Sequence, residues 1–505
     1  MCRTSADAKY NMHNRPEAAG RLIIRACIAL FTGVVIVLLQ SVFWTNAVSG
    51  SMRAIVLVTA LVAYFRPQSG LLALAVLTPL GQVGSRTLDS NMRGAEALVL
   101  AFLAGALLRG WTLHRFRSLR PDALLIAGVV FSGVVAASCA GQLRLFQLRR
   151  DFSAFVLDVS TYAVRHYLVG FDGLGTIFSA MLLLEGVALL IYVVHYCRAR
   201  REFAHQLIAS LVLGAVAAAA VNFTYVGFHL AENGLTAATM RAMLSTRWSF
   251  HIGDMNAAAS FLAMAMFTAI GMSSRTTTRK GWWIAAAVLI AIAFWLTGSR
   301  TALVAVLLAA AGLAAKSAME RSRRVSMSTA VAIAAAVLVT VSVLVAQFFP
   351  AAFVGATASQ AVRIRWLFLG TTWRMLLAQP LFGVGVGQYA RWSSYFSAPE
   401  MASLYTRENA HNYFAQIAGE LGLLGLITFV WLLAVAFRHR AWRSDARPHP
   451  ALGPVTAGLA VFILTWLGGH PLLVPEVSYP FWLALGVVPG VSAATPHESH
   501  AASGT

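Results

Sequence analysis

The sequence predicts an all-α polytopic membrane protein, and three observations lead to that fold class. Of 505 residues, 58% are hydrophobic and only 11% are charged, whereas a soluble domain carries about 25% charged residues. The mean hydropathy is +0.70. Apolar segments of near membrane-crossing length recur along the chain without the strict alternation of β-barrel strands. Because lipid cannot hydrogen-bond to the backbone, these segments are expected to span as helices.

About 12 to 14 transmembrane helices are expected, and the first is interpreted as an uncleaved helix because it is longer than a signal-peptide core. The expected spans are 22–44, 53–65, 70–84, 95–109, 121–140, 173–196, 204–226, 255–273, 281–297, 301–315, 328–349, 418–437, 451–468 and 479–494. The predicted organisation is a cytoplasmic tail (1–25), a transmembrane bundle (26–349), a large periplasmic loop (350–410), C-terminal transmembrane helices (411–494) and a cytoplasmic tail (495–505).

The net charge of +20 is attributed to short basic clusters between the spans rather than to a nucleic-acid partner. The clusters are Arg109/Arg115/Arg117/Arg120, Arg198/Arg200/Arg201, Arg275/Arg279/Lys280, Lys316/Arg321/Arg323/Arg324 and Arg438/Arg440/Arg443/Arg447. Counted from a cytoplasmic N-terminus, each cluster falls on the cytoplasmic side, as the positive-inside rule requires. The sequence therefore predicts that the long loop lies on the side of the membrane opposite the cytoplasm.

Neither a metal nor a cofactor is expected. The four cysteines (Cys2, Cys27, Cys139 and Cys197) form no CxxC pair and no Cys/His ligand spacing. The loops assigned to the outside hold no carboxylate cluster that would suit an oxygen-ligated cation.

Arginine is unexpectedly frequent in the loops assigned to the outside, where the positive-inside bias should deplete it. These arginines are Arg144, Arg149, Arg150, Arg165, Arg241, Arg247, Arg300, Arg363, Arg365, Arg374, Arg391 and Arg407. The acids facing them are few, chiefly Asp254, Glu400 and Glu408. The planar guanidinium of arginine forms bidentate hydrogen bonds with phosphate oxygens, so these arginines indicate an anionic ligand. For any one of them, contact with lipid headgroups is the alternative interpretation.

Two local patterns stand out among these loops. Thr297-Gly298-Ser299-Arg300 is a tight turn that places Arg300 at the mouth between two spans, where it either snorkels outward or points into an open cavity. His411 closes the long loop near a helix N-terminus, where a structural histidine is the ordinary interpretation. Asn409 and Asn412 beside it are ordinary helix-capping residues.

A third pattern has Gly383, Gly385 and Gly387 at alternate positions. Such spacing resembles a phosphate cradle, but glycine spacing alone is weak evidence. A turn that re-enters close packing is the favoured interpretation.

The motifs together resemble the O-antigen ligase and O-antigen polymerase family over roughly residues 245–440. Leu296–Arg300 is similar to the family's Ser-Arg turn, and Arg365 with 380–385 resembles its "R…W…PlfGvG" stretch. Leu369 stands where tryptophan is common, which leaves Arg363 as the alternative register. Residues 410–425 are similar to the "HN…E.GllG" block, and 254–256 resembles a "PN" element without its proline.

This resemblance implies a C-type glycosyltransferase-like fold without a metal or cofactor. Such proteins transfer a glycan from undecaprenyl pyrophosphate to lipid A–core, to a growing glycan or to protein hydroxyls. The ligase reaction is favoured, and the polymerase and protein O-oligosaccharyltransferase reactions remain alternatives.

Site roles follow from the resemblance and from the chemistry of an inverting displacement. Arg300 and Arg365 are expected to bind the pyrophosphate, and His411 is expected to be the general base. The weaker candidates for substrate contacts are Arg247, Asn256, Arg363 and Asn412.

A transporter of lipid-linked glycans is the rival class. Glu185, a lone acid in mid-span, is its best support, because acids inside the membrane are often functional. A glutamate bonded to a neighbouring helix is an equally good interpretation. The absence of an internal repeat in the sequence weakens the transporter hypothesis.

Overall fold

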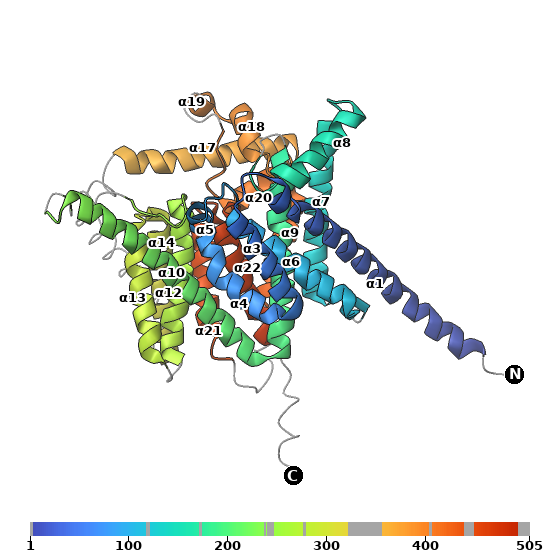
Figure 1. Ribbon diagram of the computed structural model, residues 1–505, viewed down its shortest axis with the longest axis horizontal. Coiled ribbons are helices and arrows are strands. Elements are labelled where there is room, and N and C mark those ends of the chain that lie inside the picture. Colours follow the sequence, from blue (N-terminus) through green and yellow to red (C-terminus); the bar gives the residue numbers. More distant parts are fainter. Residues whose placement is uncertain are drawn as a thin grey trace, which may run out of the picture.

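The computed structural model describes residues 4–117, 122–170, 174–236, 239, 247–275, 279–321, 356–402, 407–438 and 449–492. The regular elements in these ranges are all helical (Figure 1), which confirms the predicted fold class.

Seven candidate membrane spans lie among the described residues, and they make this a multi-pass membrane protein. The first covers Leu22–Trp44, which is the end of α1 (Thr4–Leu39) together with α2 (Ser41–Trp44). The others are α6 (Gly94–Thr112), α7 (Ala123–Gln147), α9 (Gly175–Ala199), α10 (Arg201–Asn233), α12 (Met255–Arg275) and α20 (Tyr413–Phe437).

The bundle also contains these described helices: α3 (Gly50–Phe65), α4 (Pro67–Leu77), α5 (Gly81–Thr87), α13 (Lys280–Leu296), α14 (Arg300–Arg321), α21 (Leu452–Thr465) and α22 (Pro475–Ser492). The expected span 328–349 lies outside the described residues. The expected number of transmembrane helices, about 12 to 14, stays a prediction.

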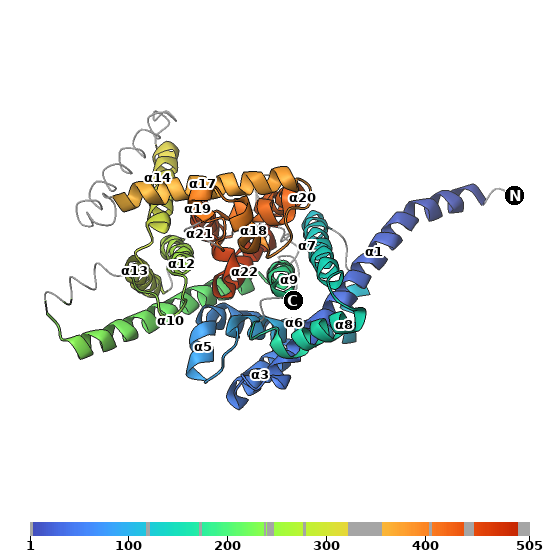
Figure 2. The same cartoon turned by 90° about the horizontal axis from the view of Figure 1, so that it is seen from above.

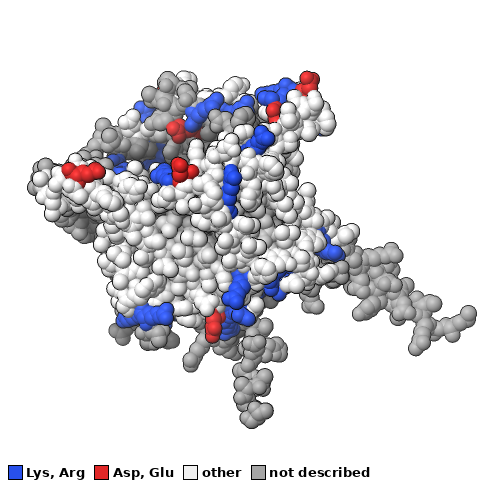
Figure 3. Space-filling view, in the orientation of Figure 1, with Lys and Arg blue, Asp and Glu red and all other residues white. Residues whose placement is uncertain are grey.

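Charged side chains gather at the two ends of the bundle, and the band between them is almost uncharged (Figure 3). A band of this kind suits contact with the hydrocarbon layer, where an unpaired charge is costly. The segregation agrees with the spans identified from length and hydropathy.

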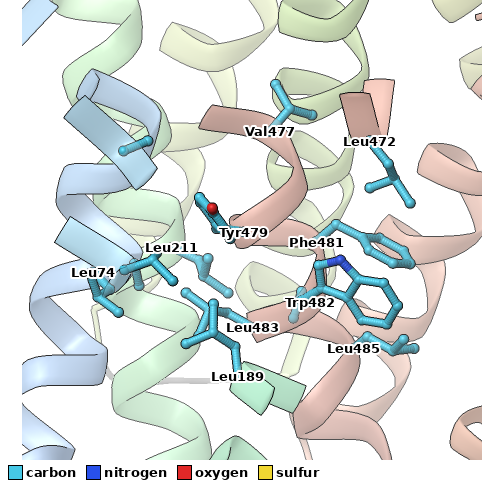
Figure 4. Close-up of a cluster of buried hydrophobic side chains, with 14 of the residues drawn as sticks. Leu74, Leu189, Leu211, Leu472, Val477, Tyr479, Phe481, Trp482, Leu483 and Leu485 are labelled. Atoms are coloured by element: carbon cyan, nitrogen blue, oxygen red, sulfur yellow. The ribbon is translucent and has the colours of Figure 1, made fainter. Parts of the chain in front are cut away.

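The core forms around α22, which lies among α9, α12, α20 and α21 when the bundle is viewed from above (Figure 2). Tyr479, Phe481 and Trp482 of this helix are fully buried. They lie in an apolar cluster with Leu189 and Leu211, which come from α9 and α10 (Figure 4). The tight packing of small and large side chains fixes the position of α22.

A hydrogen-bonded group links three helices inside the bundle. The hydroxyl of Tyr479 contacts Glu96 Oε2 at 3.1 Å and also Glu185 Oε2, and Tyr167 contacts the other oxygen of Glu96. Glu185 is therefore bonded to a neighbouring helix, as one of its two interpretations anticipated.

One end of the bundle is covered by the part of the expected long loop that the structure describes. Here α17 (Ala356–Ala378) lies across the ends of the other helices, with α18 (Tyr389–Phe396) and α19 (Pro399–Ala402) above it (Figures 1 and 2). Trp366, Trp373 and Leu377 form an exposed apolar stripe on α17. We call this end of the molecule the α17 face.

Candidate functional site

The candidate site is built around the turn that joins α13 to α14. Gly298 has a φ of 59°, which favours glycine, and a Cβ atom there would lie 2.9 Å from Arg247 Cγ. The backbone N–H of Trp248 donates to Leu296 O at 2.8 Å, so the segment before α12 lies against this turn. The glycine thus permits both the turn and the close approach of Arg247.

Asn256 joins this segment to the turn. Its Oδ1 accepts hydrogen bonds from Arg247 Nη2 at 2.8 Å and from Ser299 Oγ at 2.9 Å. Arg247 Nε also donates to Thr297 O at 2.9 Å. Two fixed hydrogen bonds therefore orient the Arg247 guanidinium, which leaves its remaining N–H groups for a ligand.

Arg247, Arg300 and Arg365 form the cationic cluster. Arg365 reaches it from α17 and donates from Nη2 to Thr301 Oγ1 at 3.0 Å. Burial lowers the pKa of Arg247 and of Arg365, and the nearby charge of Arg300 lowers both further, while Asp254 opposes the decrease at Arg247. Within the described ranges, none of the three lies within ion-pair distance of a carboxylate. Asp254 is the one acid that acts on Arg247 among the described residues. Three neighbouring cations therefore outnumber it, which favours binding of an anion.

Other arginines of the α17 face are engaged elsewhere. Arg363 pairs with Glu400 at 2.7 Å on an exposed surface, away from the turn that Arg365 contacts. Arg374 Nε donates to the carbonyl oxygen of Phe396. The structure thus brings Arg365 into the cluster and gives Arg363 a different partner.

His411 lies beside this cluster in a left-handed backbone conformation, with a φ of 49°. Its ring centroid is 5.1 Å from that of Phe368 and 5.1 Å from that of His470, and Nε2 is 3.7 Å from Glu408 Oε2. Burial lowers the pKa of His411, Glu408 raises it, and the charge of Arg365 lowers it. Because burial is the largest of these effects, the imidazole is neutral near pH 7 and can accept a proton.

His470 is a neighbour of His411 that sequence reasoning missed. Burial lowers its pKa to about 4, and the proximity of His411 contributes to the decrease. The only available sequence signal was its place in the short loop 469–478, which was assigned to the same side as His411.

A recess opens between the starts of α12 and α14 and the loop that follows α21. Its polar lining comes from Asn256, Ser260, Ser299, Thr301, Thr465 and His470. Arg247 and Arg365 each donate to one of these lining residues. The cationic cluster therefore lies at the border of this recess. We call the recess itself the cationic recess.

Asn412 begins α20 and has a structural role. Its Oδ1 accepts from Ala415 N at 3.0 Å, which caps the helix, and its Nδ2 donates to Leu467 O at 3.3 Å. Tyr413 N donates to Trp466 O at 2.9 Å. These bonds hold the His411 segment against the loop that carries His470.

The three alternating glycines form a packed turn, which was the favoured interpretation. Gly383, Gly385 and Gly387 all have positive φ values, of 65°, 109° and 69°. The N–H of Gly385 donates to Glu420 O, and the N–H of Gly387 donates to Glu420 Oε2, both at 2.9 Å. Since these donors are satisfied by α20, they do not form a phosphate cradle.

Comparison with known families confirms the resemblance found in the sequence. Residues 285–430 match the family model described as O-antigen ligase. The matched range contains Arg300, Arg365 and His411. Members of the matched family are ligases and polymerases. A comparison with curated proteins gave no match.

Proposed function

We propose that the protein is an O-antigen ligase-type glycosyltransferase of the bacterial inner membrane. It moves a glycan from undecaprenyl pyrophosphate to an acceptor hydroxyl of lipid A–core at the α17 face, which lies in the periplasm. The observation that carries this proposal is the meeting of the cationic cluster with the neutral imidazole of His411 beside one recess.

The donor's pyrophosphate suits the cationic cluster. Its charged oxygens need several cations, and each guanidinium can offer two parallel N–H donors. Arg300 starts α14, so the charge sits at the end of the bundle where a lipid headgroup would lie. The lipid tail can then remain in the bilayer while the sugar projects beyond it.

In the proposed step the acceptor oxygen attacks the anomeric carbon while its proton passes to the unprotonated ring nitrogen of His411. The bond from the anomeric carbon to the phosphate oxygen breaks, and its electron pair leaves with undecaprenyl pyrophosphate. Arg300 and Arg365 stabilise the added negative charge. The products are a glycosidic bond, the lipid pyrophosphate and a protonated His411, which then returns its proton to water.

Attack opposite the leaving group inverts the configuration at the anomeric carbon. The lipid pyrophosphate is a competent leaving group, so the step requires no general acid. The protein's own residues supply the charge stabilisation and the base, and the reaction proceeds without a metal.

Replacement of His411 by asparagine tests the proposed base. Asparagine tolerates the left-handed backbone, so His411→Asn removes the imidazole with little backbone cost. Attachment of glycan to lipid A–core should fall by about 10²- to 10⁴-fold. The matched control is His114→Asn, because His114 also has a positive φ, of 53°, and is exposed outside the site.

Both variants would be measured in a deletion strain, with their membrane levels checked. Near-normal attachment by a well-expressed His411→Asn protein would contradict the base role. The deletion strain itself separates ligase from polymerase. Free lipid A–core together with long undecaprenyl-linked glycan supports a ligase, whereas lipid A–core capped by single repeats indicates a polymerase.

A further inference from the structure

A second cavity, distinct from the cationic recess, lies just below the α17 face. Its volume is about 240 Å³, below the roughly 300–1,000 Å³ typical of sites for drug-sized ligands, so it suits a ligand of about one ring. It lies among the first turns of α9, the first turns of α20 and the glycine turn, and its lining includes Phe178, Ser179, Asn409, Tyr413 and Glu420.

The two spaces flank one short segment of the chain. His470 and Pro471 line the cationic recess, whereas Leu472 and Leu473 line the second cavity. Asn409, at the edge of the second cavity, is two residues from His411, whose ring lies 5.1 Å from that of His470. The proposed base therefore lies at the junction of the two spaces.

The second cavity differs from the recess in its charge. Its lining contains no arginine, lysine or histidine, and its one ionisable acid is the buried Glu420. Both oxygens of Glu420 accept hydrogen bonds, Oε1 from Gln416 at 2.7 Å and Oε2 from the N–H of Gly387 at 2.9 Å. The lining residues themselves offer a phosphate no cation, which favours an uncharged ligand; the nearby guanidinium of Arg93 is stacked on the Phe178 ring, 3.6 Å from its centroid.

The remaining lining combines polar and apolar groups in the way that a sugar ring requires. Gln416 donates to Asn409 Oδ1 at 3.1 Å, and no hydrogen bond among the described residues uses the amide NH₂ of Asn409. The hydroxyl of Ser179 is a second polar group of the lining. Phe178 and Leu473, which are only partly buried, offer apolar surface for the C–H faces of a ring.

We infer that the second cavity binds the uncharged sugar ring that carries the acceptor hydroxyl, and that Asn409 and Ser179 recognise its other hydroxyls. This inference rests on the proposed transferase function. The donor's charged headgroup binds the cationic cluster at the border of the recess, the acceptor ring occupies the second cavity, and the two reacting atoms meet at His411.

The test is to fill the cavity and measure the two substrates separately. The probes are undecaprenyl-pyrophosphate-linked O-glycan as donor and purified lipid A–core as acceptor, used with the full-length protein. Ser179→Leu should raise the KM for lipid A–core by roughly tenfold or more, while the KM for the donor stays within about twofold. The matched control, Ser153→Leu on the exposed start of α8 (Phe152–Thr161), should leave both KM values unchanged.

Asn409→Asp provides a second variant if Ser179→Leu does not fold. It keeps the oxygen that accepts from Gln416 and replaces the unused amide donor with a carboxylate. Its KM for lipid A–core should also rise. An unchanged acceptor KM in folded variants, or a rise confined to the donor KM, would overturn the inference. Absence of transfer by the wild-type protein would instead overturn the proposed function.

Discussion

Arg300 is the residue at the centre of the cationic cluster, because its charge acts on both Arg247 and Arg365. Like charges held together in a partly buried place repel one another, and a bound anion relieves this repulsion. The stability of the cluster is therefore linked to its ligand. This link makes the three arginines suited to a diphosphate rather than to a neutral headgroup.

Arg365 and Arg363 are predicted to respond very differently to substitution, although only Ile364 separates them. Arg365→Ala should lower the transfer rate by about 10²- to 10³-fold, since it removes a donor aimed at the leaving group. Arg363→Ala should have little effect, because Arg363 pairs with Glu400 on an exposed surface. Initial rates of both variants at matched protein levels provide the measurement, and equal losses would contradict this arrangement.

The pH dependence of transfer should follow the titration of His411. The base must be neutral, and burial lowers its pKa from the ordinary value of 6.5. The rate should therefore rise with pH through a midpoint below 6.5 and be level near pH 7. Glu408 raises this pKa. Glu408→Gln should therefore move the acidic limb of the pH–rate profile, where the rate rises with pH, to lower pH.

Rates measured from about pH 5 to 8 would show this shift. A matched substitution at an acid away from the imidazole, Glu232→Gln, should leave the limb in place, since Glu232 is exposed at the end of α10. Movement of the limb to higher pH in Glu408→Gln would argue against His411 as the titrating base.

Sequence reasoning selected Arg300, Arg365 and His411 because local motifs mark them. The fold places them next to residues that line one recess, and their catalytic roles stay predictions. His470 and Ser179 were not selected, because their proximity to the site arises from packing between segments far apart in the chain. No local pattern in the sequence encodes that proximity.

At the scale of elements, the glycine turn and α20 hold each other in place. Gly422 interrupts the helical backbone of α20 with a φ of 66°, and Leu381 O lies 2.4 Å from where its Cβ would be. Leu423 N donates to Pro380 O at 2.9 Å across this contact. The sequence predicted a turn at 383–387. It did not predict that the helical backbone of α20 is interrupted where this turn packs against it, because the apolar sequence of α20 continues through that point.

Gly422→Ala should therefore destabilise the protein by about 1–3 kcal/mol, because alanine would strain the left-handed backbone and clash with the turn. Gly133→Ala is the matched control, since Gly133 lies within helical α7 with nothing within 4 Å of the added Cβ. Thermal unfolding in detergent would compare the two. Equal unfolding temperatures for both variants would contradict the proposed interlock.

At the scale of the whole molecule, the group formed by Glu96, Glu185 and Tyr479 joins α6, α9 and α22. The hydropathy of the sequence predicted the helical bundle. It left two interpretations of Glu185 open, a functional acid within the membrane and a glutamate bonded to a neighbouring helix. Its partner lies 294 positions away along the chain, so only the fold identifies it. The bonding favours a structural interpretation of Glu185 and weakens the best support for a transporter.

Tyr479→Phe should lower the stability of the bundle by about 1–3 kcal/mol, because it leaves buried carboxyl oxygens without their donor. Tyr395→Phe is the matched control, since Tyr395 is 76% exposed on α18. Thermal unfolding of the purified variants in detergent provides the measurement. A Tyr479→Phe protein as stable as the control would show that the hydroxyl does not support the bundle.

Reconstitution tests the central claim of glycan transfer most directly. Purified protein in liposomes would receive undecaprenyl-pyrophosphate-linked glycan and lipid A–core, with a metal chelator present and no ion gradient imposed. The account predicts covalent attachment of glycan to lipid A–core with release of undecaprenyl pyrophosphate, and loss of both products in Arg365→Ala. Movement of the lipid-linked glycan across the bilayer without any covalent transfer would contradict it.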